Sequence, residues 1–186
     1  MTRPLIVGFS GNPSRPSKTR GFVDHVVREI ARSEGYDTAV YDVVDLGPSF
    51  RLADSADGLD RKAREIADHV ERAEILVVGS PTYKGSYTGL FKHFFDLLDP
   101  AALRGKPVLL TATGGGPRHA LVMEHAMRPL FGFFEAFALP TAVYATEQDF
   151  RDGIIDSPSI IARIEQATAD ARRSLSYRAP FNVAAE

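Results

Sequence analysis

The sequence predicts an α/β fold, in which a doubly wound parallel β-sheet carries helices on both faces. Five short apolar runs alternate along the chain with segments of helical periodicity, the pattern typical of consecutive strand-helix-strand units. The runs are continuous, as expected for strands covered on both faces. A length of 186 residues suits a single domain, so we expect residues 1–186 to form one, with a C-terminal tail over 176–186.

Each expected element follows from this alternation of patterns. The apolar runs predict five strands, at Leu5 to Phe9, Ala39 to Val44, Ile75 to Gly79, Val108 to Ala112 and Thr141 to Ala145. The helical periodicities predict five helices, at Thr19 to Glu34, Asp60 to Arg72, Ser86 to Leu98, Arg118 to Phe137 and Ser157 to Leu175. The longest polar loop, Pro48 to Gly58, and the tail are each expected either to pack on a second subunit or to stay mobile.

The composition argues against several classes of function. The chain has 22 basic and 24 acidic residues, and a net charge of -2 provides no cationic field, so we expect no nucleic-acid partner. The absence of cysteine rules out disulfides, thiolate metal sites and cysteine nucleophiles, and we predict no metal site. No signal peptide or run of membrane-spanning length is evident, which favours a cytoplasmic protein without membrane contact. Redox chemistry would require a borrowed cofactor.

Three loops carry the candidate binding residues. In an open parallel sheet, ligands bind outside the carboxyl ends of the strands, where the strand order reverses. The loops that follow the first, third and fourth predicted strands are Ser10 to Thr19, Pro81 to Ser86 and Thr113 to His119. We therefore expect these three loops to meet at one edge of the sheet.

The first loop has the character of a phosphate site. It is rich in hydroxyls and opens a helix whose free amide groups attract an anion. Ser17 and Thr19 offer hydroxyl groups, and Arg15 or Lys18 offers a positive charge. The alternative is an ordinary helix cap with a proline-rich entry. The loop lacks the glycine spacing of a P-loop or of a dinucleotide fold, so a nucleoside triphosphatase is not expected.

The second loop suits a flat ring. Pro81, Thr82 and Tyr83 can lie along an apolar ring system, while the backbone around Lys84 and Gly85 reaches its polar edge. Ser86 is expected to cap the helix that follows. The alternatives are that Tyr83 packs against its own loop and that Lys84 is simply solvated.

The third loop places glycines after a strand. Following Thr113, Gly114 and Gly115 remove the Cβ atoms that would keep backbone amides from a ligand. Such amides can stabilise the negative charge of a reduced flavin. His119 either touches the ligand or occupies the first turn of the next helix. A glycine turn alone is weak evidence, and its position after the fourth strand adds weight.

These motifs together resemble a known family. The run S-P-T-Y-K-G-S-Y-T-G-L-F-K, the hydroxyl-rich first loop, and T-G-G-G followed by H-A-L-V-M-E-H-A-M-R-P-L are similar to those of the flavodoxin-like NAD(P)H-dependent FMN reductases. The nearest likeness is to the reductases of two-component alkanesulfonate and methanesulfonate monooxygenases. It covers almost the whole chain, from Ile6 to about Leu175.

The resemblance implies a fold, a reaction and a set of contacts. The fold is a five-stranded sheet of order 2-1-3-4-5, and the reaction passes hydride from NADH or NADPH to FMN, which is then handed to an FMNH2-dependent monooxygenase. Orienting the two rings requires no protein acid or base, so no catalytic residue is predicted. The implied phosphate contacts are Ser10, Asn12, Ser17, Lys18 and Thr19. The implied ring contacts are Pro81, Thr82, Tyr83, Lys84, Gly85, Ser86, Gly114 and Gly115.

The fourth predicted helix raises the question of assembly. Some sulfonate-linked members insert a tyrosine there, which forms a π-bulge at a tetramer interface beside the flavin, and the matching position is His125. The alternative is an ordinary helical histidine before the proline kink at Pro129. Because this helix is apolar on most of its sides, we expect a homodimer or a homotetramer.

Other functions remain open at the level of sequence. The same three loops would serve a quinone, azo-dye or metal-ion reductase with tightly held FMN. A one-electron flavodoxin carrier is disfavoured, because such carriers are usually strongly acidic and this chain has a net charge of only -2. A receiver domain is disfavoured because no acidic cluster follows the first strand.

Overall fold

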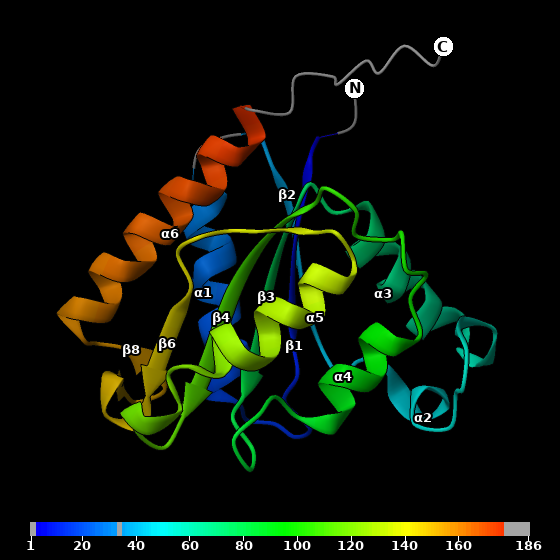
Figure 1. Cartoon of the computed structure of the whole chain (residues 1–186), viewed down its shortest axis with the longest axis horizontal. Helices are drawn as coiled ribbons and strands as arrows, with labels where there is room; N and C mark the ends of the chain where they lie inside the picture. The colour runs from blue at the N-terminus through cyan, green and yellow to red at the C-terminus, as the bar shows by residue number, and fades with distance from the viewer. Residues whose placement is uncertain (1–2, 33–34, 177–186) are drawn as a thin grey trace.

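The computed structural model describes residues 3–32 and 35–176. It has three layers, a central parallel sheet between two layers of helices (Figure 1). The strand order is β2-β1-β3-β4, and both β5 and β6 lie beyond β4. The strands are β1 (Leu5–Ser10), β2 (Asp37–Asp42), β3 (Ile75–Pro81), β4 (Pro107–Gly114), β5 (Phe137–Ala138) and β6 (Val143–Thr146). This arrangement confirms the predicted fold class and strand order.

Helices cover the two faces of the sheet unequally. On one face α1 and α6 pack against each other and the sheet, and α3, α4 and α5 cover the opposite face (Figure 1). The helices are α1 (Lys18–Ile30), α2 (Gly47–Phe50), α3 (Arg61–Arg72), α4 (Gly89–Asp96), α5 (Arg128–Phe133) and α6 (Pro158–Ser176). Shorter elements are the 3-10 turns Ala56–Gly58, Pro117–His119 and Glu147–Asp149, a π-helix at Met123–Met127, and a hairpin of β7 (Phe150–Arg151) and β8 (Ile154–Ile155). None of the described helices is both long and apolar enough to cross a lipid bilayer.

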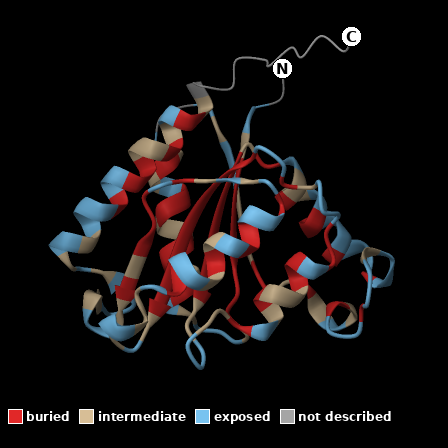
Figure 2. Cartoon of the chain, viewed as in Figure 1, coloured by how far each residue is buried: buried red, intermediate tan, exposed pale blue. Residues whose placement is uncertain are grey.

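The core beneath α4 is built from aromatic side chains. Phe9 of β1 stacks on Phe94 of α4 with ring centroids 4.1 Å apart, and Phe95 meets Phe131 of α5 edge to face at 5.0 Å. All four side chains are fully buried. Figure 2 shows the buried colour running through the strands and the inner helix faces. This packing anchors α4 and α5 on the sheet, because each aromatic ring removes a large apolar area from water.

The second strand lies two residues earlier than predicted. It covers Asp37–Asp42, whereas the apolar run had indicated Ala39 to Val44. The carboxylate of Asp42 accepts hydrogen bonds from the amides of Val44 and Asp45, at 2.9 and 3.2 Å. This local turn of the aspartate side chain onto its own backbone ends the strand.

The helices after β1 and β3 also differ from expectation at their ends. The hydroxyl of Thr88 accepts from the amide of Phe91 at 3.2 Å, so Thr88 caps α4, and the predicted cap at Ser86 is wrong. α1 ends at Ile30, short of the predicted end at Glu34, which lies outside the described residues.

The predicted fourth helix and fifth strand are both divided. The helix is a 3-10 turn, a π-helix and then α5, which ends at Phe133. A left-handed backbone at Glu135 (φ 52°) follows, and Phe137 belongs to β5 instead of a helix. In place of one strand over Thr141 to Ala145, β5 pairs with the start of β4 and β6 with its end. Pro140 stands between them, and proline cannot donate to a strand ladder.

The segment from Pro48 to Gly58 is structured on its own chain. Its Phe50 is fully buried, and the Phe50 carbonyl lies 2.9 Å from Nε2 of His93 in α4. Phe50 thus holds this segment on its own chain, while Leu52 is 89% exposed, and the choice between a second subunit and mobility stays a prediction. The tail beyond Ser176 lies outside the described residues.

The crowding around Gly79 of β3 gives a test of the fold. A Cβ atom there would lie 2.4 Å from Cγ2 of Val23 and 2.7 Å from the hydroxyl of Thr111. Gly79→Ala should lower the free energy of unfolding by about 1–3 kcal/mol, because the core must shift to admit the methyl group. Urea unfolding measures the change. Gly21→Ala is the matched control, because its Cβ would lie 3.9 Å from the nearest atom on a helix surface. Equal midpoints for Gly79→Ala and the parent chain would contradict the packing described.

Candidate functional site

Hydrogen bonds join the three predicted loops at the carboxyl ends of β1, β3 and β4. The amide of Thr82 in the second loop donates to the carbonyl of Thr113 in the third at 2.7 Å, and the hydroxyl of Thr88, just after the second loop, donates to the carbonyl of Gly11 in the first at 2.6 Å. The hydroxyls of Thr19 and Thr113 lie 2.6 Å apart. The structure thus brings the three loops together, as the position of the strand ends predicts.

A cavity of about 190 Å³ lies among these loops. Its lining comes from all three loops and from a fourth segment, the one that follows β6. The predicted residues in the lining are Lys18, Pro81, Thr82, Tyr83, Thr113, Gly114 and Gly115. The predicted residues outside it are Ser10, Asn12, Arg15, Ser17, Thr19, Lys84, Gly85, Ser86 and His119. The cavity is therefore one part of the predicted site.

The sequence reasoning missed three residues of the lining, Thr146, Glu147 and Phe150. Thr146 ends β6 and pairs in register with Gly114 at the end of β4. The signal that could have found them is the rule that located the other loops, since the carboxyl end of β6 lies at the same edge of the sheet.

The start of α1 carries the features of an anion site. The hydroxyl of Ser17 accepts from the amide of Arg20 at 3.2 Å and so caps the helix. The first amides of a helix have no partner within it, and they carry the positive end of the helix dipole. Close by in the sequence, the hydroxyl of Ser10 and Oδ1 of Asn12 are buried without a hydrogen-bond partner among the described residues. Such orphaned polar atoms are rare in folded proteins, and they fit a bound ligand.

Asn12 is oriented by its neighbours. Its Nδ2 donates to the carbonyl of Ser14 at 3.0 Å and to the carboxylate of Asp42 at 3.1 Å. These two acceptors identify the nitrogen, and Oδ1 is then an acceptor that needs a donor. A hydroxyl group of a ligand satisfies that need better than a phosphate oxygen does.

Arg15 has two carboxylate partners. Its Nε and Nη2 donate to Asp42, both at 2.8 Å, and Nη2 also lies 2.6 Å from Asp45. These hydrogen bonds raise the pKa of Arg15 above its ordinary value. For Asp42, burial raises the pKa, but the bonds from Arg15 and Asn12 outweigh burial and hold it below its usual value. The charge of Arg15, which the sequence assigned to a ligand phosphate, is therefore balanced within the protein.

Lys18 is the first residue of α1, and its side chain contacts the segment that follows β6. Its ammonium group pairs with Glu147 and lies 5.8 Å from the ring centroid of Phe150. All three residues line the cavity. The predicted cation is therefore present at the site, with a carboxylate that competes for it.

The second loop is a tight turn. The amide of Tyr83 donates to the carbonyl of Ser86 at 2.8 Å, and the Ser86 amide returns a bond of 3.2 Å. Lys84 (φ 54°) and Gly85 (φ 88°) both adopt the left-handed backbone that a two-residue turn of this kind requires. The turn leaves Tyr83 with 52% of its surface exposed at the rim of the cavity. A flat ligand ring has an aromatic and backbone surface to lie on.

The third loop requires glycine at one position. A Cβ atom on Gly114 would lie 2.2 Å from the hydroxyl of Tyr144, which donates to the carbonyl of Gly116 at 2.8 Å. Gly115 has open space around it. His119 lies in the 3-10 turn Pro117–His119, and its Nε2 lies 3.2 Å from Nε of Arg118.

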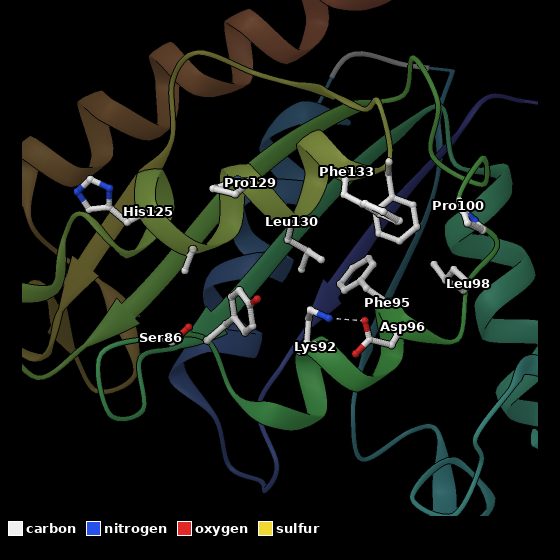
Figure 3. Close-up of a pocket in the computed structure, with 13 residues that line it drawn as sticks. Ser86, Lys92, Phe95, Asp96, Leu98, Pro100, His125, Pro129, Leu130 and Phe133 are labelled. Atoms are coloured by element: carbon white, nitrogen blue, oxygen red, sulfur yellow. Dashed lines mark hydrogen bonds and ion pairs between the residues drawn. The ribbon is translucent and has the colours of Figure 1, made fainter.

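A larger cavity, of about 750 Å³, lies between α4 and the π-helix with α5 (Figure 3). His125 is at the centre of the π-helix Met123–Met127, where the sequence indicated a π-bulge, and it is exposed at one end of the cavity. Phe133 lines the other end, and the Lys92–Asp96 ion pair lies on the α4 side. Of these two cavities, only the smaller one is lined by all three loops at the strand ends.

Comparisons with known proteins identify the family of this chain. The family model described as NADPH-dependent FMN reductase matches residues 4–151. The chain is 42% identical to an FMN reductase (NADPH) of Pseudomonas aeruginosa PAO1 and 43% identical to the NADH-dependent FMN reductase SfnF of Pseudomonas fluorescens Pf0-1. Each match covers 90% of both chains. The crystal structure of an oxidoreductase from Corynebacterium diphtheriae superposes with a TM-score of 0.85 at 32% identity, covering 95% of this chain and 98% of that one.

The match to the family model extends over most of the chain and includes all three loops of the site. The identities to the two Pseudomonas reductases hold over nearly the full length of each protein. The chain therefore belongs to the NADPH-dependent FMN reductase family and is an NAD(P)H:FMN oxidoreductase.

Proposed function

We propose that FMN lies across the carboxyl edge of the sheet as a substrate that is reduced and released. The observation that carries this proposal is the meeting of the three loops around one cavity, together with two buried polar atoms of the first loop, Ser10 Oγ and Asn12 Oδ1, that have no hydrogen-bond partner among the described residues. The phosphate sits against the first amides of α1, the Ser10 hydroxyl and Lys18. Asn12 Oδ1 accepts from a hydroxyl of the ribityl chain, and the ring rests on the Tyr83 turn.

The protein contributes position and electrostatics to the reaction. FMN supplies the ring that accepts hydride from the nicotinamide. The exposed face of the turn at Tyr83 leaves room for the two rings to stack, and holding them in contact removes much of the entropic barrier. Amides of Gly114 and Gly115 stabilise the negative charge that develops at the pyrimidine edge. No side chain is assigned as a proton donor or acceptor.

The ion pair between Lys18 and Glu147 supports the proposal that FMN is released from the site. A carboxylate that already holds the site's cation repels a bound phosphate and lowers the affinity for FMN. Weak retention is what a protein needs if it hands on reduced FMN. Elution of the protein from gel filtration with FMN still bound would instead favour a reductase that keeps its flavin.

The resemblance of the three loops to reductases of sulfonate systems supports a more specific role. We propose that the reduced FMN goes to a two-component alkanesulfonate or methanesulfonate monooxygenase in the cytoplasm. Free FMNH2 reacts rapidly with oxygen, so a reductase of this kind works best beside its acceptor.

We also propose that the larger cavity is a contact between copies of this chain. Phe133 lines this cavity and is a large apolar side chain with 67% of its surface exposed. A twofold contact uses the same patch on both subunits, so an exposed side chain in this patch becomes buried in each of the two subunits. The Lys92–Asp96 pair leaves the rim without net charge, which permits a like surface to approach.

The first prediction from this proposed function concerns activity. Mixing the protein with free FMN and NADH or NADPH should consume nicotinamide over many turnovers per protein molecule, because FMN exchanges with solvent. Absorbance at 340 nm measures the rate, with FMN, FAD and riboflavin compared as acceptors. If the protein oxidises neither NADH nor NADPH, the proposed function is wrong.

The second prediction concerns the third loop. Gly114→Ala should raise the KM for FMN about tenfold, because the methyl group displaces Tyr144 and the loop amides, a misfit worth about 1.4 kcal/mol. Gly115→Ala is the control and should change KM little, since its Cβ meets nothing within 4 Å. Equal effects of the two substitutions would contradict the assignment of the ring to this loop.

The third prediction concerns assembly. Phe133→Asp should convert a dimer or tetramer to a smaller species, because it places a carboxylate where about 1.5–3 kcal/mol of apolar burial per side chain is expected. Light scattering after size-exclusion chromatography measures the mass. Ile154→Asp is the control, since Ile154 is 70% exposed on the β7–β8 hairpin, away from the larger cavity. A parent chain that runs as a monomer overturns the proposal.

A further inference from the structure

The buried carboxylate of Asp42 is the most heavily bonded side chain beside the first loop. It lies at the end of β2 and has no exposed surface. It accepts from Nδ2 of Asn12 at 3.1 Å and from Nε and Nη2 of Arg15 at 2.8 Å each. Nε of Arg20, in the first turn of α1, lies 3.3 Å away. A single carboxylate thus contacts the beginning and middle of the loop and the helix that the loop enters.

Asp42 is itself held in one place. Its carboxylate accepts from the amides of Val44 and Asp45, which fixes its position against the backbone that follows β2. None of its partners belongs to the cavity lining. Asp42 therefore touches no part of the proposed flavin position, and any influence on the flavin passes through Asn12, Arg15 and the loop between them.

Resting on the proposed function, we propose that Asp42 is a positioning residue that sets the preference for FMN over riboflavin by holding the Asn12 to Ser17 loop in its phosphate-binding shape. The loop has two prolines, Pro13 and Pro16, and few backbone bonds of its own. The side-chain contacts to Asp42 provide the order that the backbone does not. Amides presented in a fixed arrangement bind phosphate better than amides that must be ordered on binding.

An opposite effect competes with this one. Asp42 brings a negative charge near a phosphate, and its removal would free Arg15 to approach the ligand. Arg15 would still be paired with Asp45, however, at 2.6 Å. Loss of order should therefore outweigh gain of charge, and the two effects predict changes of opposite sign in FMN affinity.

The test measures flavin binding without nicotinamide, by quenching of flavin fluorescence. Asp42→Asn keeps the size of the side chain and removes its charge. We expect its Kd for FMN to rise about tenfold, the loss of roughly one charge-assisted hydrogen bond to phosphate. The Kd for riboflavin should rise less, because riboflavin has no phosphate to lose and Asn12, which contacts the ribityl chain, keeps its hydrogen bond to the Ser14 carbonyl. Arg15→Gln breaks the same network from the loop side and should act in the same direction if Asp42→Asn does not fold.

The control is Asp60→Asn, which removes a carboxylate that caps α3 away from the loop. It should reduce stability and leave the ratio of the two Kd values unchanged. Tighter FMN binding by Asp42→Asn, an unchanged ratio, or equal weakening toward both flavins would each overturn the role of Asp42. A parent chain that binds FMN no better than riboflavin would reject the phosphate cradle itself, and Asp42's role with it, which is a distinct result.

Discussion

The shared register of β1, β3 and β4 is the constraint on which the site depends. Ser10 pairs with Gly79, Gly79 with Thr111, and Pro81 with Thr113, so the three strands end at the same edge within a few residues. Helix α1 can pack this close to the strands because β3 has a glycine, Gly79, at the point where Val23 of α1 contacts the sheet. Each loop then leaves the sheet beside the others, and the cavity follows from the geometry of the strands rather than from any one motif.

Local patterns were enough to locate the strands and the loops. The apolar runs at β1, β3 and β4 are continuous, and strands of that kind are buried on both faces. Once the strands are placed, the rule for parallel sheets locates the loops. The elements that failed are those where a single residue competes with the pattern. Pro140 divides the last strand, and Thr88 competes with Ser86 as the helix cap.

Tertiary partners were beyond the reach of the sequence. The charge of Arg15 reads as available for a ligand, yet Asp42 and Asp45 lie about 30 residues away and meet it only in the fold. The same holds for Glu147, which follows β6 and lies 129 residues from its partner Lys18 in the sequence. Residue type and spacing describe what a loop can bind. They do not describe which of its groups the protein has already engaged.

The divided last strand has a consequence for solubility. An outer strand presents unpaired amides and carbonyls, and a long flat one is a template for another chain to join. Here that border is two short pieces, Phe137–Ala138 and Val143–Thr146, with Pro140 between them. The interruption leaves no continuous row of donors and acceptors on this side. This border of the sheet is thereby protected from edge-to-edge aggregation, while the carboxyl ends of the strands remain free to form the loops of the site.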